Sequence, residues 1–275
     1  MTTPFFLPAR LRRQAIAAAL ACAAGLPVAQ AAVNPSEAPD PGGSFSNINY
    51  GSSGNVFQLT PLVFIAGLGS AGNPASVTGL NPALSFGVQV GGAGTSLLTI
   101  DYRITNLSTT DSFSQLRFMV FANPDGEQTH YLDQVSETWG PAGTGDAVRR
   151  EVHAFSNDPF DSIPGRFSAN ANLTDGAPDA ACLAATGCDA VMGLQWNADT
   201  LGPNKSFTVR LALSDNGQSI SGRSLSFAGV GAGASSLTVS GTVAVVPEPS
   251  TWAMALAGLV AVGSLARRRS AARQG

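Results

Sequence analysis

The sequence contains few of the residues that build metal centres and catalytic triads. It has two histidines, His130 and His153, and three cysteines in 275 residues. A structural zinc site needs four such ligands at close spacing, and no C-x2-C pair is present to supply half of them. The G-x-S-x-G turn that presents a nucleophilic serine is also missing. We therefore expect no zinc site, no cofactor and no catalytic residue.

Basic residues are also scarce in the central part of the chain. Seven of the 15 basic residues lie in the two terminal segments, so eight remain against 18 acidic residues, which gives a net charge of −10. A surface of this charge is soluble and repels nucleic acid. No basic stripe with interleaved aromatic residues is present. We expect no nucleic-acid partner.

Helical periodicity is absent from the central part of the chain, which shows strand periodicity instead. Apolar and polar side chains alternate in residues 98–105, 207–213 and 237–245, as in strands with one face on a core. Residues 116–121 and 191–196 are more uniformly apolar, which favours central strands. The sequence predicts an all-β fold over residues 44–246, an antiparallel β-sandwich (immunoglobulin-like or jelly-roll-like) of roughly eight to ten strands.

The first 31 residues have the features of a signal peptide. Three arginines between residues 10 and 13 precede a weakly apolar stretch, and an A-x-A site ends at Ala31. We expect export by the Sec machinery with cleavage after Ala31, followed by a linker over residues 32–43. A mitochondrial-type presequence and a lipid-modified Cys22 are the alternatives.

The C-terminal segment combines a proline motif, an apolar run and a basic stop. The residues are Pro247, Glu248 and Pro249, then the run that starts at Trp252, then Arg267, Arg268 and Arg269. Residues 252–266 are expected to form a short membrane helix with Trp252 at the outer interface, and residues 271–275 are expected to form a cytoplasmic end. Residues 246–270 resemble the PEP-CTERM sorting tail of Gram-negative bacteria, and we place the tail at residues 247–270. An ordinary tail anchor is the alternative.

This resemblance implies a processing enzyme and a location. Tails of this family are cut by an exosortase, and the proteins that carry them are associated with exopolysaccharide and biofilm. We therefore expect a transient inner-membrane anchor and then a place at the cell surface or in the extracellular matrix. The function implied is that of a non-enzymatic surface or matrix protein. A carbohydrate-binding module and a secreted polysaccharide hydrolase are the alternatives.

Cys182 and Cys188 are the two cysteines of the exported body, and they are close in sequence. In an oxidising compartment such a pair predicts a disulfide. Closing a loop of about seven residues contributes roughly 2 kcal/mol to stability. The bond is expected to be structural.

Trp139 is the residue that we single out for ligand binding. It precedes Gly140 and Pro141, so it is expected at the end of a strand, where an exposed aromatic ring can bind a sugar ring. His153 is expected to point into solvent, on the same polar strand face as Glu151.

Carboxylates offer two weaker hypotheses. A hydrolase needs two of them across a sugar, and the candidates in one region are Glu127, Asp133, Glu137 and Glu151. A calcium ion would need loop oxygens, which two pairs of acids offer: Asp125 with Glu127, or Asp175 with Asp179.

Overall fold

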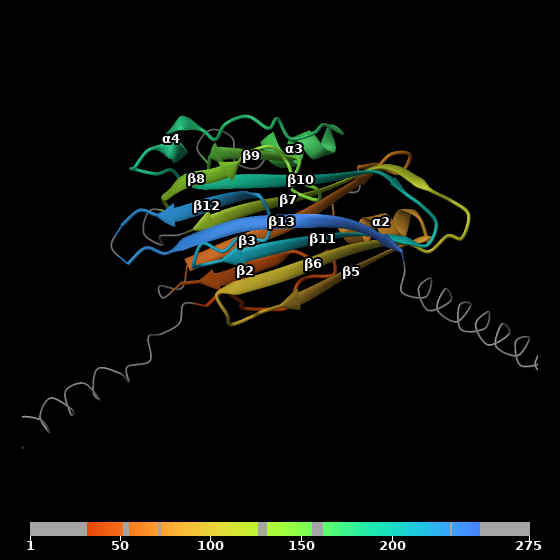
Figure 1. The fold of residues 1–275 in the computed structure, drawn as a ribbon, viewed down its shortest axis with the longest axis horizontal. Helices are drawn as coiled ribbons and strands as arrows, with labels where there is room; N and C mark the ends of the chain where they lie inside the picture. The colour runs from red at the N-terminus through yellow and green to blue at the C-terminus, as the bar shows by residue number, and fades with distance from the viewer. Residues whose placement is uncertain are drawn as a thin grey trace, which may run out of the picture. The chain divides into compact units, whose positions relative to one another are not determined.

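The computed structural model describes residues 32–51, 55–70, 73–125, 131–155, 162–231 and 233–247. Its strands form two antiparallel sheets (Figure 1). The first sheet has the order β1-β2-β3-β7-β10-β9, with β4 paired to β3, and the second has the order β5-β6-β11-β13-β12-β8. The predicted all-β class is therefore confirmed, and the arrangement is consistent with a β-sandwich.

The described residues contain the strands of these two sheets and three short helices. The first sheet contains β1 (Asn34–Pro35), β2 (Phe45–Tyr50), β3 (Asn55–Ile65), β4 (Gly69–Ser70), β7 (Phe113–Asp125), β9 (Arg149–Ala154) and β10 (Ala190–Leu201). The second sheet contains β5 (Leu84–Gly91), β6 (Leu97–Asn106), β8 (Asp133–Trp139), β11 (Lys205–Ser214), β12 (Arg223–Gly229) and β13 (Ser236–Pro247). The helices are α2 (Pro74–Leu80), α3 (Ser162–Ser168) and α4 (Ala180–Leu183).

The main core lies between the sheets and is built from alternate residues of each strand. In β6 the apolar set at 98, 100, 102 and 104 is at most 1% exposed, as the alternation of residues 98–105 predicts. The odd positions 207–213 of β11 and 237–239 of β13 face the same core. Trp196 from β10 is 0% exposed and contributes the largest side chain. Burial of these apolar side chains is the main stabilising term of the sandwich.

A second, smaller core covers the outer face of the first sheet. Met119, Phe121 and Val191 on this face pack against Ile163 and Phe167 of α3, and all five are at most 9% exposed. Residues 116–121 and 191–196 are thus mostly apolar because β7 and β10 are buried on both faces. Both strands are central in their sheet, as predicted.

Two expectations need correction. The segment 32–43, expected as a linker, is part of the fold, because Val33 is 0% exposed and β1 pairs with β2. Three short helices interrupt a body in which no helical pattern was expected. With at most seven residues each, they are too short to show an amphipathic period.

Membrane-spanning structure was predicted for residues 252–266, which lie outside the described residues. Within the described part of the chain, no helix is long and apolar enough to cross a membrane. The predicted signal peptide, residues 1–31 with its cleavage site at Ala31, also lies outside the description.

Candidate functional site

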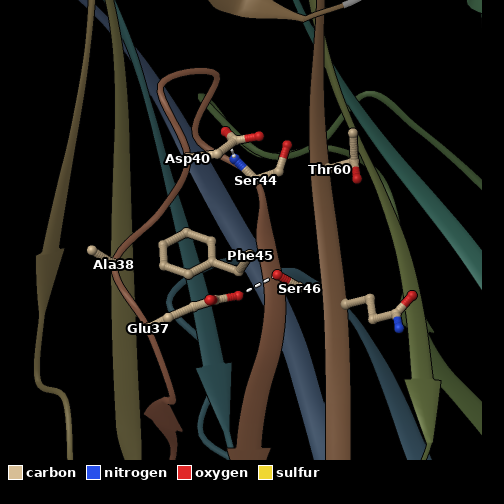
Figure 2. Close-up of a pocket in the computed structure, with 8 residues that line it drawn as sticks. Glu37, Ala38, Asp40, Ser44, Phe45, Ser46 and Thr60 are labelled. Carbon is tan, nitrogen blue, oxygen red and sulfur yellow. Dashed lines mark hydrogen bonds between the residues drawn. The ribbon is translucent and has the colours of Figure 1, made fainter.

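A polar pocket of about 470 Å³ lies beside β2 and β3. Figure 2 shows that Glu37 and Asp40, from the loop before β2, lie against two serines: Ser46 in β2 and Ser44 directly before it. Asp40 Oδ1 accepts a hydrogen bond from the Ser44 N–H (2.8 Å), and Ser46 Oγ donates to Glu37 Oε1. Both carboxylates therefore fasten their own loop to β2. These two hydrogen bonds hold the loop in place, and the arrangement gives no indication of a catalytic pair.

The environment of Trp139 differs from the exposed position expected from the sequence. The indole is partly buried against the main core, and its Nε1–H donates to Asp175 Oδ1 (3.0 Å). The guanidinium groups of Arg150 and Arg223 lie 5.0 Å and 4.8 Å from the ring centroid. Because the ring already carries two cation–π contacts, it does not stand free as a platform for a sugar.

Arg150 lies at the centre of this cluster and is almost fully buried. Its side chain is 7% exposed and donates to both carboxylate oxygens of Glu137 at 2.6 Å, and to the carbonyl of Asp175 at 2.8 Å. β9 and β8, which carry Arg150 and Glu137, are edge strands of the two different sheets. The bidentate pair therefore ties the sheets together at one edge. The one sequence signal for it is that Arg150 alternates with Val152 and so falls on the core face.

Glu151 occupies the opposite face of β9, where it was expected to meet solvent. Its side chain is 2% exposed and accepts hydrogen bonds from Arg166 Nε (2.8 Å) and the Thr174 N–H (3.1 Å). The Nε2 atom of His153 lies 2.8 Å from Glu151 Oε1, and the imidazole is 25% exposed. Burial alone would raise the pKa of Glu151, but the hydrogen bonds from His153, Thr174 and Arg166 hold this pKa below its ordinary value. The carboxylate is thus kept charged.

A second group of acids behaves in the opposite way. Burial, and next the negative charge of Asp189, raises the pKa of Asp125 to about 6. Burial also raises the pKa of Asp189. Tyr50 is 0% exposed, and burial followed by the charges of Asp133 and Asp125 raises its pKa. These groups gather where β7 ends and β10 begins.

Of the other predicted pairs, the disulfide between Cys182 and Cys188 is confirmed, with the two Cα atoms 4.6 Å apart. One of the two pairs of acids proposed for calcium has protein donors: Asp175 Oδ1 accepts from Trp139, and Asp179 Oδ2 accepts from the Ala154 N–H (3.0 Å). Glu127 and His130 lie outside the described residues. No group of three or more histidine, cysteine or acidic residues able to hold a metal occurs in the described part of the chain. The calcium hypothesis stays a prediction.

The C-terminal end of the described chain leads into the predicted sorting tail. Pro247 is the last residue of β13 and lies opposite Lys205 of β11. The remaining residues of the motif, Glu248, Pro249, Trp252 and the three arginines, lie outside the described part. Residues 245–270 match the family model described as the PEP-CTERM protein-sorting motif. The predicted resemblance of the tail is confirmed.

The PEP-CTERM match covers the tail and leaves the β-sandwich unassigned. It implies an exported protein of a Gram-negative bacterium that is anchored transiently in the membrane and processed by an exosortase. Neither a curated protein nor a solved structure matches the chain. What the sandwich does must therefore be argued from its own residues.

Proposed function

We propose that this protein is a non-enzymatic component of the cell surface or extracellular matrix, associated with exopolysaccharide after an exosortase has cut it from its anchor. The observation that carries the proposal is the PEP-CTERM motif at residues 245–270. The body that it delivers has a net charge of −10 once the basic ends are set aside. Such a charge favours a soluble domain that does not adhere to anionic lipid or nucleic acid.

The carboxylates of the body support the non-enzymatic part of the proposal. Glu137 is held by both arms of the Arg150 guanidinium, and Glu151 is held by Arg166. An acid catalyst needs a proton to give, whereas the hydrogen bonds on Glu151 hold the pKa of this carboxyl below its ordinary value. The ion pairs of Glu137 with Arg150 and of Glu151 with Arg166 favour a structural role for these two carboxylates.

The experiment that tests the proposal measures the intact mass of the protein in membrane and extracellular fractions. Strains with and without an exosortase are compared, with the full-length chain in each. We expect loss of the tail only when the exosortase is present. A double variant, Pro247→Ala with Pro249→Ala, is expected to block this cut, and Pro203→Ala, in the β10–β11 turn, serves as the matched control. An uncut chain in both strains would leave an ordinary anchored protein and remove the support for a matrix role.

A secreted polysaccharide hydrolase is the second candidate, and one observation favours it. Asp125 has a pKa of about 6 beside Asp189, which is the property of a general acid. Among the described pockets, none is lined by either residue. Activity on polysaccharides that is lost in Asp125→Asn would establish the hydrolase. Activity lost in Glu137→Gln or Glu127→Gln would place the catalytic acid at those residues instead.

A further inference from the structure

A pocket of about 390 Å³ lies on the outer face of the first sheet, at one end of the smaller core. This volume is within the range of small-ligand sites. Side chains of β7, of β10 and of the segment after α3 line it. Except for Leu116 and Ala198 they are polar or charged: Gln115, Arg117, Asn170, Asn172, Asn197 and Asp199.

The amide groups of this pocket are held in one orientation by a buried glutamine. Gln195 is 1% exposed, and its Oε1 accepts the backbone N–H of Leu173 (2.8 Å). Because a backbone N–H can only donate, the Nε2 of Gln195 must be the donor to its other neighbours. It donates to Asn172 Oδ1 (2.7 Å) and to Asn197 Oδ1 (2.8 Å). Both asparagines therefore present their NH2 groups away from Gln195.

These two NH2 groups are available to a ligand. Within the described residues, neither Asn172 Nδ2 nor Asn197 Nδ2 donates a hydrogen bond, and both side chains are exposed. Their carbonyl oxygens are already used. The amides thus form fixed donors whose orientation is set before any ligand arrives, which lowers the entropic cost of binding.

Arg117 adds a positive charge to the lining of this pocket. Its guanidinium carbon lies 4.2 Å from the centroid of the Phe64 ring. Nη1 donates to the backbone oxygen of Asn170 (3.1 Å) and to Asn172 Oδ1 (3.5 Å), and Nη2 donates to Asn170 Oδ1. Among the described carboxylates, none forms an ion pair with it. Such a cation beside free amide donors favours an anionic group with hydrogen-bond acceptors, and it must attract that group against the repulsion of a body whose net charge is −10.

Backbone conformation marks the same place. Gln115 and Asn170 have φ angles of 52° and 57°, in the left-handed region that residues other than glycine rarely adopt. Strained residues persist where the surrounding structure holds them, and they gather at ligand sites. Asp199, on the opposite strand, supplies an acceptor for hydroxyl groups.

We propose that this pocket binds a uronic-acid residue of an acidic polysaccharide, with the sugar carboxylate on Arg117 and the Asn172 and Asn197 amides, and a hydroxyl group on Asp199. A doubly charged phosphate would meet the repulsion of Asp199, whereas a singly charged sugar uses all four groups. The inference rests on the proposed function, since an exported protein meets such polymers outside the cell.

Calorimetric titration of the purified full-length protein with tetragalacturonate tests the site. The decisive variant is Asn197→Asp, which keeps the hydrogen bond accepted from Gln195 but replaces the free donors with a negative oxygen. We expect binding by the unaltered protein and affinity weaker by at least about tenfold in Asn197→Asp and in Arg117→Gln. Asn81→Asp is the matched control, because Asn81 Oδ1 also accepts a hydrogen bond (Ala83 N–H, 2.9 Å) and Asn81 is not part of this lining.

Several outcomes would overturn the inference. They are no binding of tetragalacturonate, equal binding by Asn197→Asp, equal loss in Asn81→Asp, or equal binding of neutral cellotetraose or of inorganic phosphate. Purified protein is used, so the result does not depend on exosortase cleavage. A failed titration with normal tail processing would therefore reject the pocket alone, and blocked processing with normal titration would reject the sorting proposal alone.

Discussion

Replacement of Gly241 by alanine is expected to destabilise the sandwich by about 1–3 kcal/mol, the usual cost of overpacking a core. Gly241 lies in β13 with regular pairing to Leu211 of β11, and it faces Trp196 of the other sheet. A Cβ atom here would lie 2.7 Å from Trp196 Cζ2 and 2.8 Å from the carbonyl oxygen of Arg210. Since carbon atoms in contact prefer about 3.5–4.0 Å, one sheet must move by about 1 Å or the indole must leave its position.

The assay is urea denaturation of the full-length protein, followed by tryptophan fluorescence. An equal slope and a lower midpoint would show that stability itself has changed. In thermal unfolding the same loss corresponds to roughly 2–12 °C for a body of this size. Gly87→Ala is the control, because Gly87 also lies in a strand and its new Cβ would have no atom within 4 Å. Its stability is expected to change by less than about 0.5 kcal/mol.

A double-mutant cycle tests whether the indole is the cause. Trp196→Phe removes the ring atoms nearest to Gly241, so the two substitutions together are expected to cost less than their sum by at least about 0.5 kcal/mol. The reasoning is refuted if Gly241→Ala is as stable as the unaltered protein. It is also refuted if Gly87→Ala loses as much, since the effect would then come from glycine replacement in any strand.

Three further predictions concern the disulfide and two acids. Removal of the bond in Cys182→Ala with Cys188→Ala should lower the free energy of unfolding by about 2 kcal/mol, measured by urea denaturation, and no change would show that the loop closes without it. Glu151→Gln should cost about 1.5–3 kcal/mol at pH 7. Because the folded-state pKa of Glu151 is lowered, its stabilisation is complete above the ordinary value of about 4.3 and is lost as the pH falls through the lowered value, so a deficit that does not shrink in acid would contradict the ion-pair account. Asp125→Asn should have the opposite sign: its pKa of about 6 is raised, so ionisation destabilises the fold as the pH rises from about 4 to 6, and the variant should unfold at a higher temperature at pH 7 but not at pH 3.

The strands were predictable where one face meets the core and the other meets water. Residues 98–105 show this alternation, and every second side chain of β6 is buried as expected. The disulfide was predictable because its two residues are close in sequence and the loop between them is short. Both features are local, so their physical cause is contained in a few neighbouring residues.

The sites were less predictable because they are built from distant segments. Trp139 reads as an exposed strand end, but the residues that cover it, Arg150 and Arg223, come from strands of both sheets. The sequence predicts that Glu151 faces solvent, because no local pattern shows that α3 and the segment after it lie over β9. The pocket beside Gln195 could not be predicted for the same reason. The positions of Asn172 and Asn197 in the sequence do not show that Gln195 orients both of them.

The place of β13 in its sheet determines how the protein would respond to mechanical load. This strand lies between β11 and β12, and it ends at Pro247, where the sorting motif continues. Tension on the tail would therefore enter along an interior strand. Because the hydrogen bonds of antiparallel strands run perpendicular to the strand, such tension loads the ladder with β11 in shear over residues 238–247 and the ladder with β12 over residues 236–240. Release of β13 would therefore break two ladders, whereas release of an edge strand would break one.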